Sequence, residues 1–387
     1  MRQLWDYDCD CEDTMMGEGT KTILQVLNQF DINGEIVSVA PYGQGHINDT
    51  YLVSVSRSGK EEPEYVAQRI NKNVFPNIEL LMQNIVRVSA HVKDKIMQTN
   101  DPRWQALTLV STKQGNSFFF DDNGDYWRVY LYVKNSCTYN TPQKKGQLYE
   151  SGLAYGKFVE MLNDFPAQEL HETIPKFHDT EARMLQLHTA LKEDRVYRKN
   201  KVLSEIDFVI DRESDTSYLN LMRRQGSLPI RVTHNDTKLN NVLFDAGTDK
   251  ALCVIDLDTV MPGLLAFDYG DAIRFGANTV AEDDKNLDKC HINLHGFEEY
   301  TTGFLVYNGK TITQNEIDTL PMAAKIMTLE CGIRFLTDYL NGDIYFKIKY
   351  PEHNLVRARN QFKLVYDMEL NWHKMQKIIM DVSKNVK

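Results

Sequence analysis

Short runs in which apolar residues dominate or alternate with polar ones mark the first part of the chain. Three such runs cover residues 36–40, 50–55 and 65–70, and turn-forming sequences separate them at 43–45 and 57–60. Runs of this length, bounded by turns that contain glycine, are typical of β-strands joined as hairpins. The pattern therefore predicts an antiparallel meander.

The spacing of the apolar residues changes after Pro76. Apolar residues then recur every three to four positions, beginning with Ile78, Leu81 and Ile85, which is the spacing of an amphipathic helix. We expect this helix to pack on the small sheet. Strand-like runs then resume at three places: 107–111, 117–120 and 126–133. The first lobe thus has about five strands and one helix.

Long helical patterns dominate from about residue 135 onward, for example over 148–162 and after Phe346. Short apolar strands interrupt them, and each ends at polar residues: 230–233, 242–244 and 252–255. We therefore expect an α+β protein of two lobes. Residues 1–134 form the N-terminal lobe, with an N-terminal extension of unassigned role, and residues 135–387 form a mainly helical C-terminal lobe.

The composition narrows the class of function. The 54 acidic and 44 basic residues give a formal net charge of -10. This charge argues against non-specific electrostatic binding to nucleic acid or to an anionic membrane. No run approaches the ~18 apolar residues of a membrane span, and the first dozen residues are too acidic for a signal peptide. We expect a monomeric cytoplasmic enzyme that binds neither nucleic acid nor membrane, with its scattered cysteines reduced.

The candidate chemistry is concentrated in a segment that begins at His234. Asp236 is followed five residues later by Asn241, and after a hairpin by Asp256. An acid, an amide and a second acid in this order form a phosphoryl-transfer pattern. Asp236 is the candidate base for an attacking hydroxyl, Asn241 and Asp256 offer oxygen ligands to Mg²⁺, and Lys238 can neutralise charge on the moving phosphoryl group.

A purely structural interpretation of this segment exists. Asp and Asn residues often cap turns, and each of these residues alone could do so. The complete pattern, in which Asp236 and Asn241 are followed by a strand and then by Asp256, favours a catalytic role over a purely structural one. For His234 we favour a bracing role over proton transfer.

Two glycines in the first lobe form a candidate cover for phosphates. Gly43 and Gly45 lie between two predicted strands, where bare backbone can approach an anion closely, although a plain hairpin turn has the same composition. On the strand after the next turn, Ala67 and Arg69 share a face, which predicts a small residue at the adenine and a cation at the phosphates. Glu79, on the following helix, could pair with Arg69 or stay in solvent.

Together these residues resemble the aminoglycoside phosphotransferase and choline kinase superfamily and, within it, the N-acetylhexosamine 1-kinases. The resemblance extends over residues 36–346 and is carried by these segments: 46–51, 68–71, 233–244, 255–263 and 268–274. It implies a protein-kinase-like bilobal fold, with the nucleotide held by the N-terminal lobe. It also implies transfer of the γ-phosphate of ATP, with Mg²⁺, to the anomeric hydroxyl of GlcNAc or GalNAc.

The resemblance implies further roles. Asp268 would be a structural acid that braces the catalytic loops, and the sugar would be bound by C-terminal residues, among which we select Arg334, Asp338, Tyr345 and Phe346. His46 and Asp49 could reach the same substrate. The helical spacing of Glu330, Arg334 and Asp338 equally fits a plain salt ladder. Arg69 stands where protein kinases have a lysine.

Two alternatives stay open. A kinase of the same fold could act on another alcohol, such as an amino alcohol, homoserine, another sugar or an aminoglycoside. A catalytically silent, nucleotide-binding scaffold would be the alternative from a different class, but the presence of the base and of both metal ligands argues against it.

Overall fold

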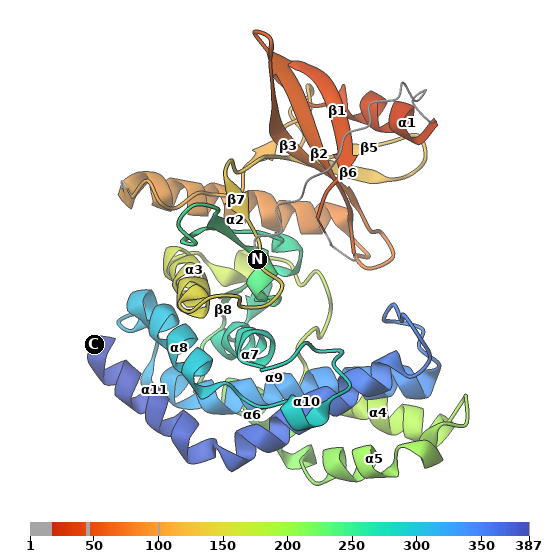
Figure 1. Cartoon of the computed structure of the whole chain (residues 1–387), viewed down its shortest axis with the longest axis vertical. Helices are drawn as coiled ribbons and strands as arrows, with labels where there is room; N and C mark the ends of the chain where they lie inside the picture. The colour runs from red at the N-terminus through yellow and green to blue at the C-terminus, as the bar shows by residue number, and fades with distance from the viewer. Residues whose placement is uncertain (1–17, 44–46, 100, 387) are drawn as a thin grey trace. The chain divides into compact units, whose positions relative to one another are not determined.

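A computed structural model describes residues 18–43, 47–99 and 101–386. Contacts within the chain divide it into two compact units (Figure 1). The first comprises the described residues of Met1–Val74 and Leu109–Tyr132, and the second those of Phe75–Thr108 and Val133–Lys387.

An antiparallel sheet of six strands forms most of the first unit. The strands run in the order β1-β2-β3-β6-β4, and β5 also pairs with β6. The elements of this unit are α1 (Glu18–Leu27), β1 (Glu35–Pro41), β2 (Asp49–Arg57), β3 (Lys60–Ile70), β4 (Leu109–Val110), β5 (Phe119–Phe120) and β6 (Tyr126–Leu131). The predicted meander is confirmed, with six strands in place of about five.

Local sequence explains the β2–β3 hairpin. Arg57 pairs with Lys60, and the two residues between them, Ser58 and Gly59, both have positive φ, at 52° and 79°. Two-residue turns with this geometry match the twist of the strands they join. One face of the sheet is apolar and packs with Val26, Leu27 and Phe30 into a core of its own.

The second unit is mainly helical. It contains α2 (Ile78–Thr99), α3 (Gln147–Met161), α4 (Thr180–Glu193), α5 (Leu203–Ile210), α6 (Tyr218–Arg224), α7 (Leu265–Gly276), α8 (Leu294–Asn308), α9 (Gln314–Asn341), α10 (His353–Leu370) and α11 (Trp372–Val386). The helix predicted after Pro76 is α2, and its contacts group it with this unit rather than with the sheet. Asn84 on its buried face donates hydrogen bonds to the carbonyl oxygens of His171 and Val260.

Two small sheets in the second unit position the loops that carry the candidate chemistry. One is the pair β8 (Arg231–Thr233) and β11 (Met261–Gly263), and the other runs β10-β9-β7, from Ala251–Val254, Val242–Asp245 and Ser136–Cys137. The short strands predicted at 230–233, 242–244 and 252–255 correspond to β8, β9 and β10. After β8 and after β10 the chain continues into segments rich in Asp and Asn, at 234–241 and 255–258. These two segments form the candidate site.

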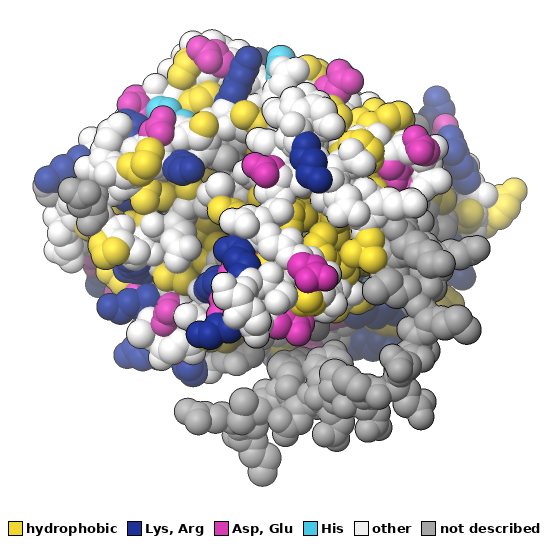
Figure 2. Space-filling model, turned by 90° about the horizontal axis from the view of Figure 1, so that it is seen from above, with side chains coloured by type: hydrophobic (Ala, Val, Ile, Leu, Met, Phe, Trp, Pro, Cys, Tyr) yellow, Lys and Arg dark blue, Asp and Glu magenta, His cyan; other side chains and the backbone are white. Residues whose placement is uncertain are grey.

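The surface carries both signs of charge. Figure 2 shows one face of the protein, on which Lys and Arg side chains lie interspersed with Asp and Glu side chains. Among the described helices, none combines the length and the apolar character needed to cross a membrane.

Candidate active site

Buried Asp268 holds the loop that follows β8. Its side chain is on α7, is 1% exposed, and accepts the backbone N–H of His234 at 2.8 Å and that of Asn235 at 2.7 Å. Burial raises the pKa of Asp268 to about 7, and the two N–H donors act in the opposite direction. These bonds fix the backbone directly before Asp236.

His234 connects the same loop to the end of β10. Its Nδ1 accepts the N–H of Asp236 at 3.3 Å, and its Nε2 lies 2.9 Å from the carbonyl oxygen of Ile255. Because a carbonyl only accepts, Nε2 carries the proton and Nδ1 does not. Burial lowers the pKa of His234, which favours this neutral ring. Both ring nitrogens are thus used in holding the two loops.

Asp236 lies between a cation and an amide. Its Oδ1 is 3.0 Å from Nζ of Lys238, and its Oδ2 accepts a hydrogen bond of 3.0 Å from Nδ2 of Asn241. The same Nδ2 also donates to the carbonyl oxygen of Asp236 at 2.8 Å. The carboxylate is 22% exposed, so it is oriented on both sides and still reachable by a substrate.

Lys238 is held in its charged form. Burial alone would lower the pKa of its ammonium group, but the charge of Asp236 and the hydrogen bond to it outweigh burial and raise that pKa above its ordinary value. Asp271 and Asp256 act in the same direction. The backbone of Lys238 is fixed as well, since its carbonyl oxygen accepts the hydroxyl of Tyr155 at 2.9 Å.

Asn241 and Asp256 are brought together by one backbone bond. The N–H of Ile255 donates to the carbonyl oxygen of Asn241 at 2.9 Å, and Asp256 follows directly in the left-handed conformation, with φ 62°. Because Nδ2 of Asn241 is used on Asp236, its Oδ1 is the atom left for a cation. An amide oxygen and a carboxylate suit Mg²⁺, which takes its other ligands from water and phosphates. Within the described part of the chain, no group of three His, Cys, Asp or Glu forms a metal site.

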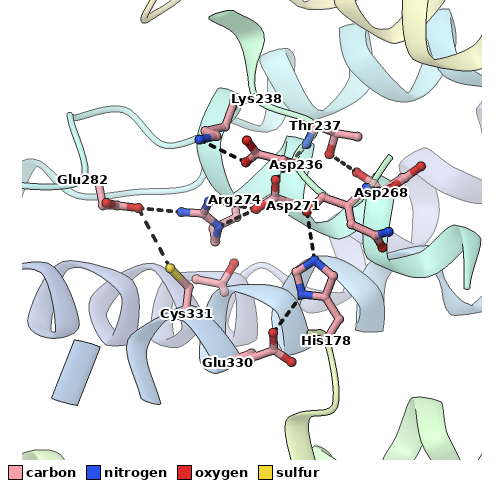
Figure 3. Close-up of polar contacts among 12 residues, drawn as sticks. His178, Asp236, Thr237, Lys238, Asp268, Asp271, Arg274, Glu282, Glu330 and Cys331 are labelled. Atoms are coloured by element: carbon pink, nitrogen blue, oxygen red, sulfur yellow. Dashed lines mark hydrogen bonds and ion pairs between the residues drawn. The ribbon is translucent and has the colours of Figure 1, made fainter. Parts of the chain in front are cut away.

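Asp271 and Arg274 extend the network on α7, as Figure 3 shows. The N–H of Thr237 donates to Oδ2 of Asp271 at 3.0 Å, and Oδ1 of Asp271 accepts from Nε and Nη2 of Arg274 at 3.0 and 2.8 Å. Arg274 also donates to Glu282 at 2.7 Å. No role for Asp271 or Arg274 was predicted from the sequence, although both lie in the segment 268–274 that carries the family resemblance and stand three residues apart on one helix.

His178 and Glu330 support the loop from the other side (Figure 3). Nε2 of His178 lies 3.0 Å from the carbonyl oxygen of Asn235, and Nδ1 lies 2.9 Å from Oε1 of Glu330. The second oxygen of Glu330 accepts the hydroxyl of Thr180 at 2.6 Å. Glu330 is therefore paired with His178, 152 positions away in the chain, and not with Arg334 four positions away.

The chain is similar to a known protein family. The chain matches the model of the phosphotransferase enzyme family over residues 38–290, a range that includes Asp236, Asn241 and Asp256. The chain belongs to the phosphotransferase enzyme family. It is accordingly a phosphotransferase.

Solved structures share the fold. A microcompartment-associated aminopropanol kinase is 14% identical, with a TM-score of 0.56 over 92% of this chain and 98% of that one. An aminoglycoside phosphotransferase from Alicyclobacillus acidocaldarius is 13% identical, with a TM-score of 0.55 over 98% of each chain. A spectinomycin phosphotransferase in complex with ADP and spectinomycin is 12% identical, with a TM-score of 0.54 over 92% of this chain and 98% of that one. The predicted kinase-like fold is thereby confirmed.

The predicted phosphate cover of this phosphotransferase is only partly described. Gly43 has φ +78°, and a Cβ there would meet no atom of the described residues within 4 Å, so the backbone conformation explains the glycine. Gly45 and His46 lie outside the described residues. Their predicted roles stay predictions.

Arg69 already has two acidic partners. Its Nε donates to Asp49 at 2.9 Å and its Nη1 to Asp125 at 3.2 Å. The guanidinium is 44% exposed, so it can reach a phosphate only in competition with these carboxylates. Asp49, a predicted sugar ligand, is used in the same pair.

Ala67 is a core residue. It is 1% exposed and packs in the cluster that contains Val26, Leu27 and Phe30, so its methyl group has no room for an adenine ring. Gln68, on the opposite face of β3, accepts two hydrogen bonds from Arg128, at 2.8 and 2.9 Å. We therefore leave Ala67 out of the proposed site.

Glu79 lies exposed in the first turn of α2. It belongs to the second unit, whereas Arg69 belongs to the first. The predicted pair between them stays a prediction.

Three of the four predicted sugar ligands in the C-terminal lobe lie together. The guanidinium carbon of Arg334 is 5.5 Å from the ring centre of Phe346 and 6.0 Å from that of Tyr345. Phe177 adds a third ring at 5.3 Å. Arg334 makes no ion pair with any residue that the structure describes. The cluster joins a cation to three aromatic rings.

Asp338 has a different role from the predicted one. It is 4% exposed, and its two oxygens accept the N–H groups of Ile344, Tyr345 and Phe346 and the amide of Asn354, at 2.8–3.0 Å. A carboxylate with all its acceptor sites used cannot bind a sugar hydroxyl as well. Asp338 instead holds the loop that presents Tyr345 and Phe346.

Proposed function

We propose that this phosphotransferase transfers the γ-phosphate of ATP to the anomeric hydroxyl of an N-acetylhexosamine. The observation that carries the proposal is the placement of Asp236 between Lys238 and Asn241, with Asp256 one residue beyond the Ile255 backbone bond. The elements of this arrangement match those of in-line phosphoryl transfer.

Each residue has a defined task. Asp236 accepts the proton of the attacking hydroxyl, and Lys238 stabilises the negative charge of the phosphoryl group as it moves. Asp268 and His234 hold the loop so that Asp236 keeps its orientation. Asn241 and Asp256 would hold Mg²⁺, which supplies charge neutralisation for the phosphates when bound. No covalent nucleophile is required, so transfer is direct.

The first unit would supply the nucleotide contacts. The glycine turn at Gly43 and the cation of Arg69 are the proposed points of contact, and the ADP bound to the spectinomycin phosphotransferase supports a nucleotide as co-substrate. Action as a monomer in the cytoplasm remains a prediction from composition.

Arg334 and its aromatic neighbours support a sugar as acceptor. An arginine offers several N–H donors in one plane, which suits neighbouring hydroxyl groups, and aromatic rings suit the apolar face of a hexose. The motifs that resemble N-acetylhexosamine 1-kinases point to the same acceptor.

The second candidate is a kinase for an amino alcohol, which the similarity to an aminopropanol kinase favours. A cationic acceptor calls for free carboxylates. The two acids nearest to Arg334 on α9, Glu330 and Asp338, are both used in internal hydrogen bonds. We therefore place the sugar first.

A coupled ADP-release assay tests the proposal. The acceptors are GlcNAc, GalNAc, glucose, galactose, choline, homoserine and kanamycin, with ATP and Mg²⁺, and ³¹P NMR identifies the product. We expect turnover of the N-acetylated hexoses and an anomeric phosphate signal. Turnover of choline or kanamycin alone would leave the catalytic residues in place and reject the sugar.

A further inference from the structure

We infer that Arg183 acts together with Arg334 to set the charge of the acceptor, so that alcohols with an uncharged N-acyl group are accepted and alcohols with a nearby ammonium group are rejected. The inference rests on the proposed function in one respect, that the acceptor binds beside Arg334. It adds a residue that neither the sequence motifs nor the phosphotransferase family match singles out.

A short chain of contacts connects the candidate base with both arginines. The carbonyl oxygen of Asn235, the residue before Asp236, is 3.0 Å from Nε2 of His178. The neighbouring Phe177 has its ring 5.3 Å from the guanidinium carbon of Arg334. Nη2 of Arg183 donates to the carbonyl oxygen of Phe177 at 2.8 Å. Both arginines thus contact Phe177, whose neighbour His178 contacts the residue before Asp236.

The two positive charges influence one another. Burial lowers the pKa of Arg183, and the charge of Arg334 lowers it further, against smaller opposing effects of Glu330, Tyr345 and Asp179. The same positive charges would disfavour an ammonium group on a ligand bound beside Arg334.

The acids nearby are committed to other partners. Glu330 accepts hydrogen bonds from His178 and Thr180. Asp179 caps α4 by accepting the N–H of Ala182 and also accepts from Asn220. Glu330 therefore has both oxygens in internal hydrogen bonds, and Asp179 receives its two donors on Oδ1 at the start of α4.

Arg183 and Arg334 have donors to offer to an uncharged ligand. Nε of Arg183 is buried without a hydrogen-bond partner among the described residues, and Arg334 is held by ring faces rather than by a carboxylate. Carbonyl and hydroxyl oxygens are the groups that such donors bind. An N-acyl group supplies a carbonyl oxygen where a free amine supplies a charge.

The test compares acceptors that differ only in N-acylation. The two pairs are GlcNAc with glucosamine and N-acetylethanolamine with ethanolamine, and kcat/KM is measured for each at pH 7. For the wild type we expect the acylated member of a pair to be favoured by about tenfold or more, and the Arg183→Gln variant to lose about tenfold of that ratio.

Two further variants separate charge from other effects. Arg195→Gln removes the same charge from a side chain that is 62% exposed and paired with Glu193, and it should leave the ratio unchanged. Arg183→Lys keeps the charge but not the guanidinium donors, and it should retain more of the ratio than Arg183→Gln. Preference for the amine in the wild type would overturn the inference, as would an equal ratio in Arg183→Gln and wild type, or a ratio in Arg183→Lys no higher than in Arg183→Gln.

Failure of the proposed function gives a different result. If GlcNAc is not turned over, but the ethanolamine pair still favours the acylated member and responds to Arg183→Gln, the hexosamine assignment fails and the charge selection stands.

Discussion

At the scale of single residues, the candidate site depends on buried polar groups whose partners come from distant parts of the chain. Asp268, Asp271 and Glu330 are each almost fully buried. Each accepts hydrogen bonds from the loop that follows β8 or from His178, which supports that loop. Buried carboxylates that are paired in this way are costly to disturb, because removal of one partner leaves the other unsatisfied.

Glu330→Gln should reveal its pairing through the pH dependence of stability. Burial would raise the pKa of Glu330, but His178 and Arg334 lower it below its ordinary value of 4.5. The stabilisation is therefore fully present above pH 4.5 and is lost as the pH falls through the lower, folded-state pKa. Denaturant titrations from pH 3 to 7 should show the variant less stable by about 2 kcal/mol at pH 7 and with a weaker loss of stability in acid.

Glu298→Gln on the exposed side of α8 serves as the control, and its stability should follow the wild type at every pH. Equal acid sensitivity in wild type and Glu330→Gln would show that the pair with His178 contributes nothing measurable.

Part of this site could be predicted from the sequence. Asp236, Asn241 and Asp256 can be proposed from the sequence because phosphoryl-transfer chemistry needs such residues at short, fixed spacings along the chain. His178 could not be found, because its partners Asn235 and Glu330 are separated from it by 57 and 152 positions. For Asp338 the sequence predicts a place on a helix, but it does not reveal that backbone N–H groups fill the acceptor sites of the carboxylate.

At the scale of elements, α3 and α8 approach one another through glycines. A Cβ at Gly303 would lie 2.1 Å from the carbonyl oxygen of Tyr149, and one at Gly152 would lie 2.3 Å from that of Tyr300. Both obstacles are backbone atoms, which a side-chain rotation cannot remove. The two helices pack in this way in a hydrophobic core cluster that also includes residues of α7.

Gly303→Ala should therefore destabilise the protein although alanine favours a helix. Alanine gains about 1 kcal/mol of helix propensity over glycine, but overpacking against fixed backbone costs about 1–3 kcal/mol or more. We expect a lower melting temperature by differential scanning calorimetry. Gly247→Ala, where the nearest atom is a side-chain oxygen at 3.4 Å, is the matched control, and a Gly303→Ala variant as stable as this control would contradict the close approach.

The order of elements followed directly from the hydrophobic pattern. The runs of apolar or alternating apolar and polar residues correspond to β1, β2, β3 and β6. The segment after Pro76, in which apolar residues recur every three to four positions, corresponds to α2. The grouping of α2 with the helical unit could not be predicted, because an amphipathic pattern shows that one face is buried but not against which partner.

At the scale of the whole molecule, nucleotide and Mg²⁺ should stabilise the folded chain together. A ligand that binds only the folded state stabilises it by about 2.7 kcal/mol at a hundredfold excess over its Kd. Thermal denaturation should therefore shift upward with ATP and Mg²⁺ and lose most of that shift when EDTA is added.

The variants distinguish the metal ligand from the base. Asp256→Asn should lose the Mg²⁺-dependent part of the shift, whereas Asp236→Asn should keep it, because Asp236 faces Lys238 and Asn241. A shift that is independent of Mg²⁺, or one that Asp256→Asn leaves intact, would reject Asp256 as a metal ligand.

The measurement that tests the account most directly is acceptor-dependent ADP release by Asp236→Asn, together with its ATP affinity from calorimetry. General-base catalysis contributes about 10²- to 10⁴-fold, so we expect turnover to fall by that factor while the Kd for ATP changes little. Asp381→Asn, on an exposed position of α11, should behave as wild type. A near-normal rate in Asp236→Asn would contradict the assignment of Asp236 as the base on which the proposed function depends.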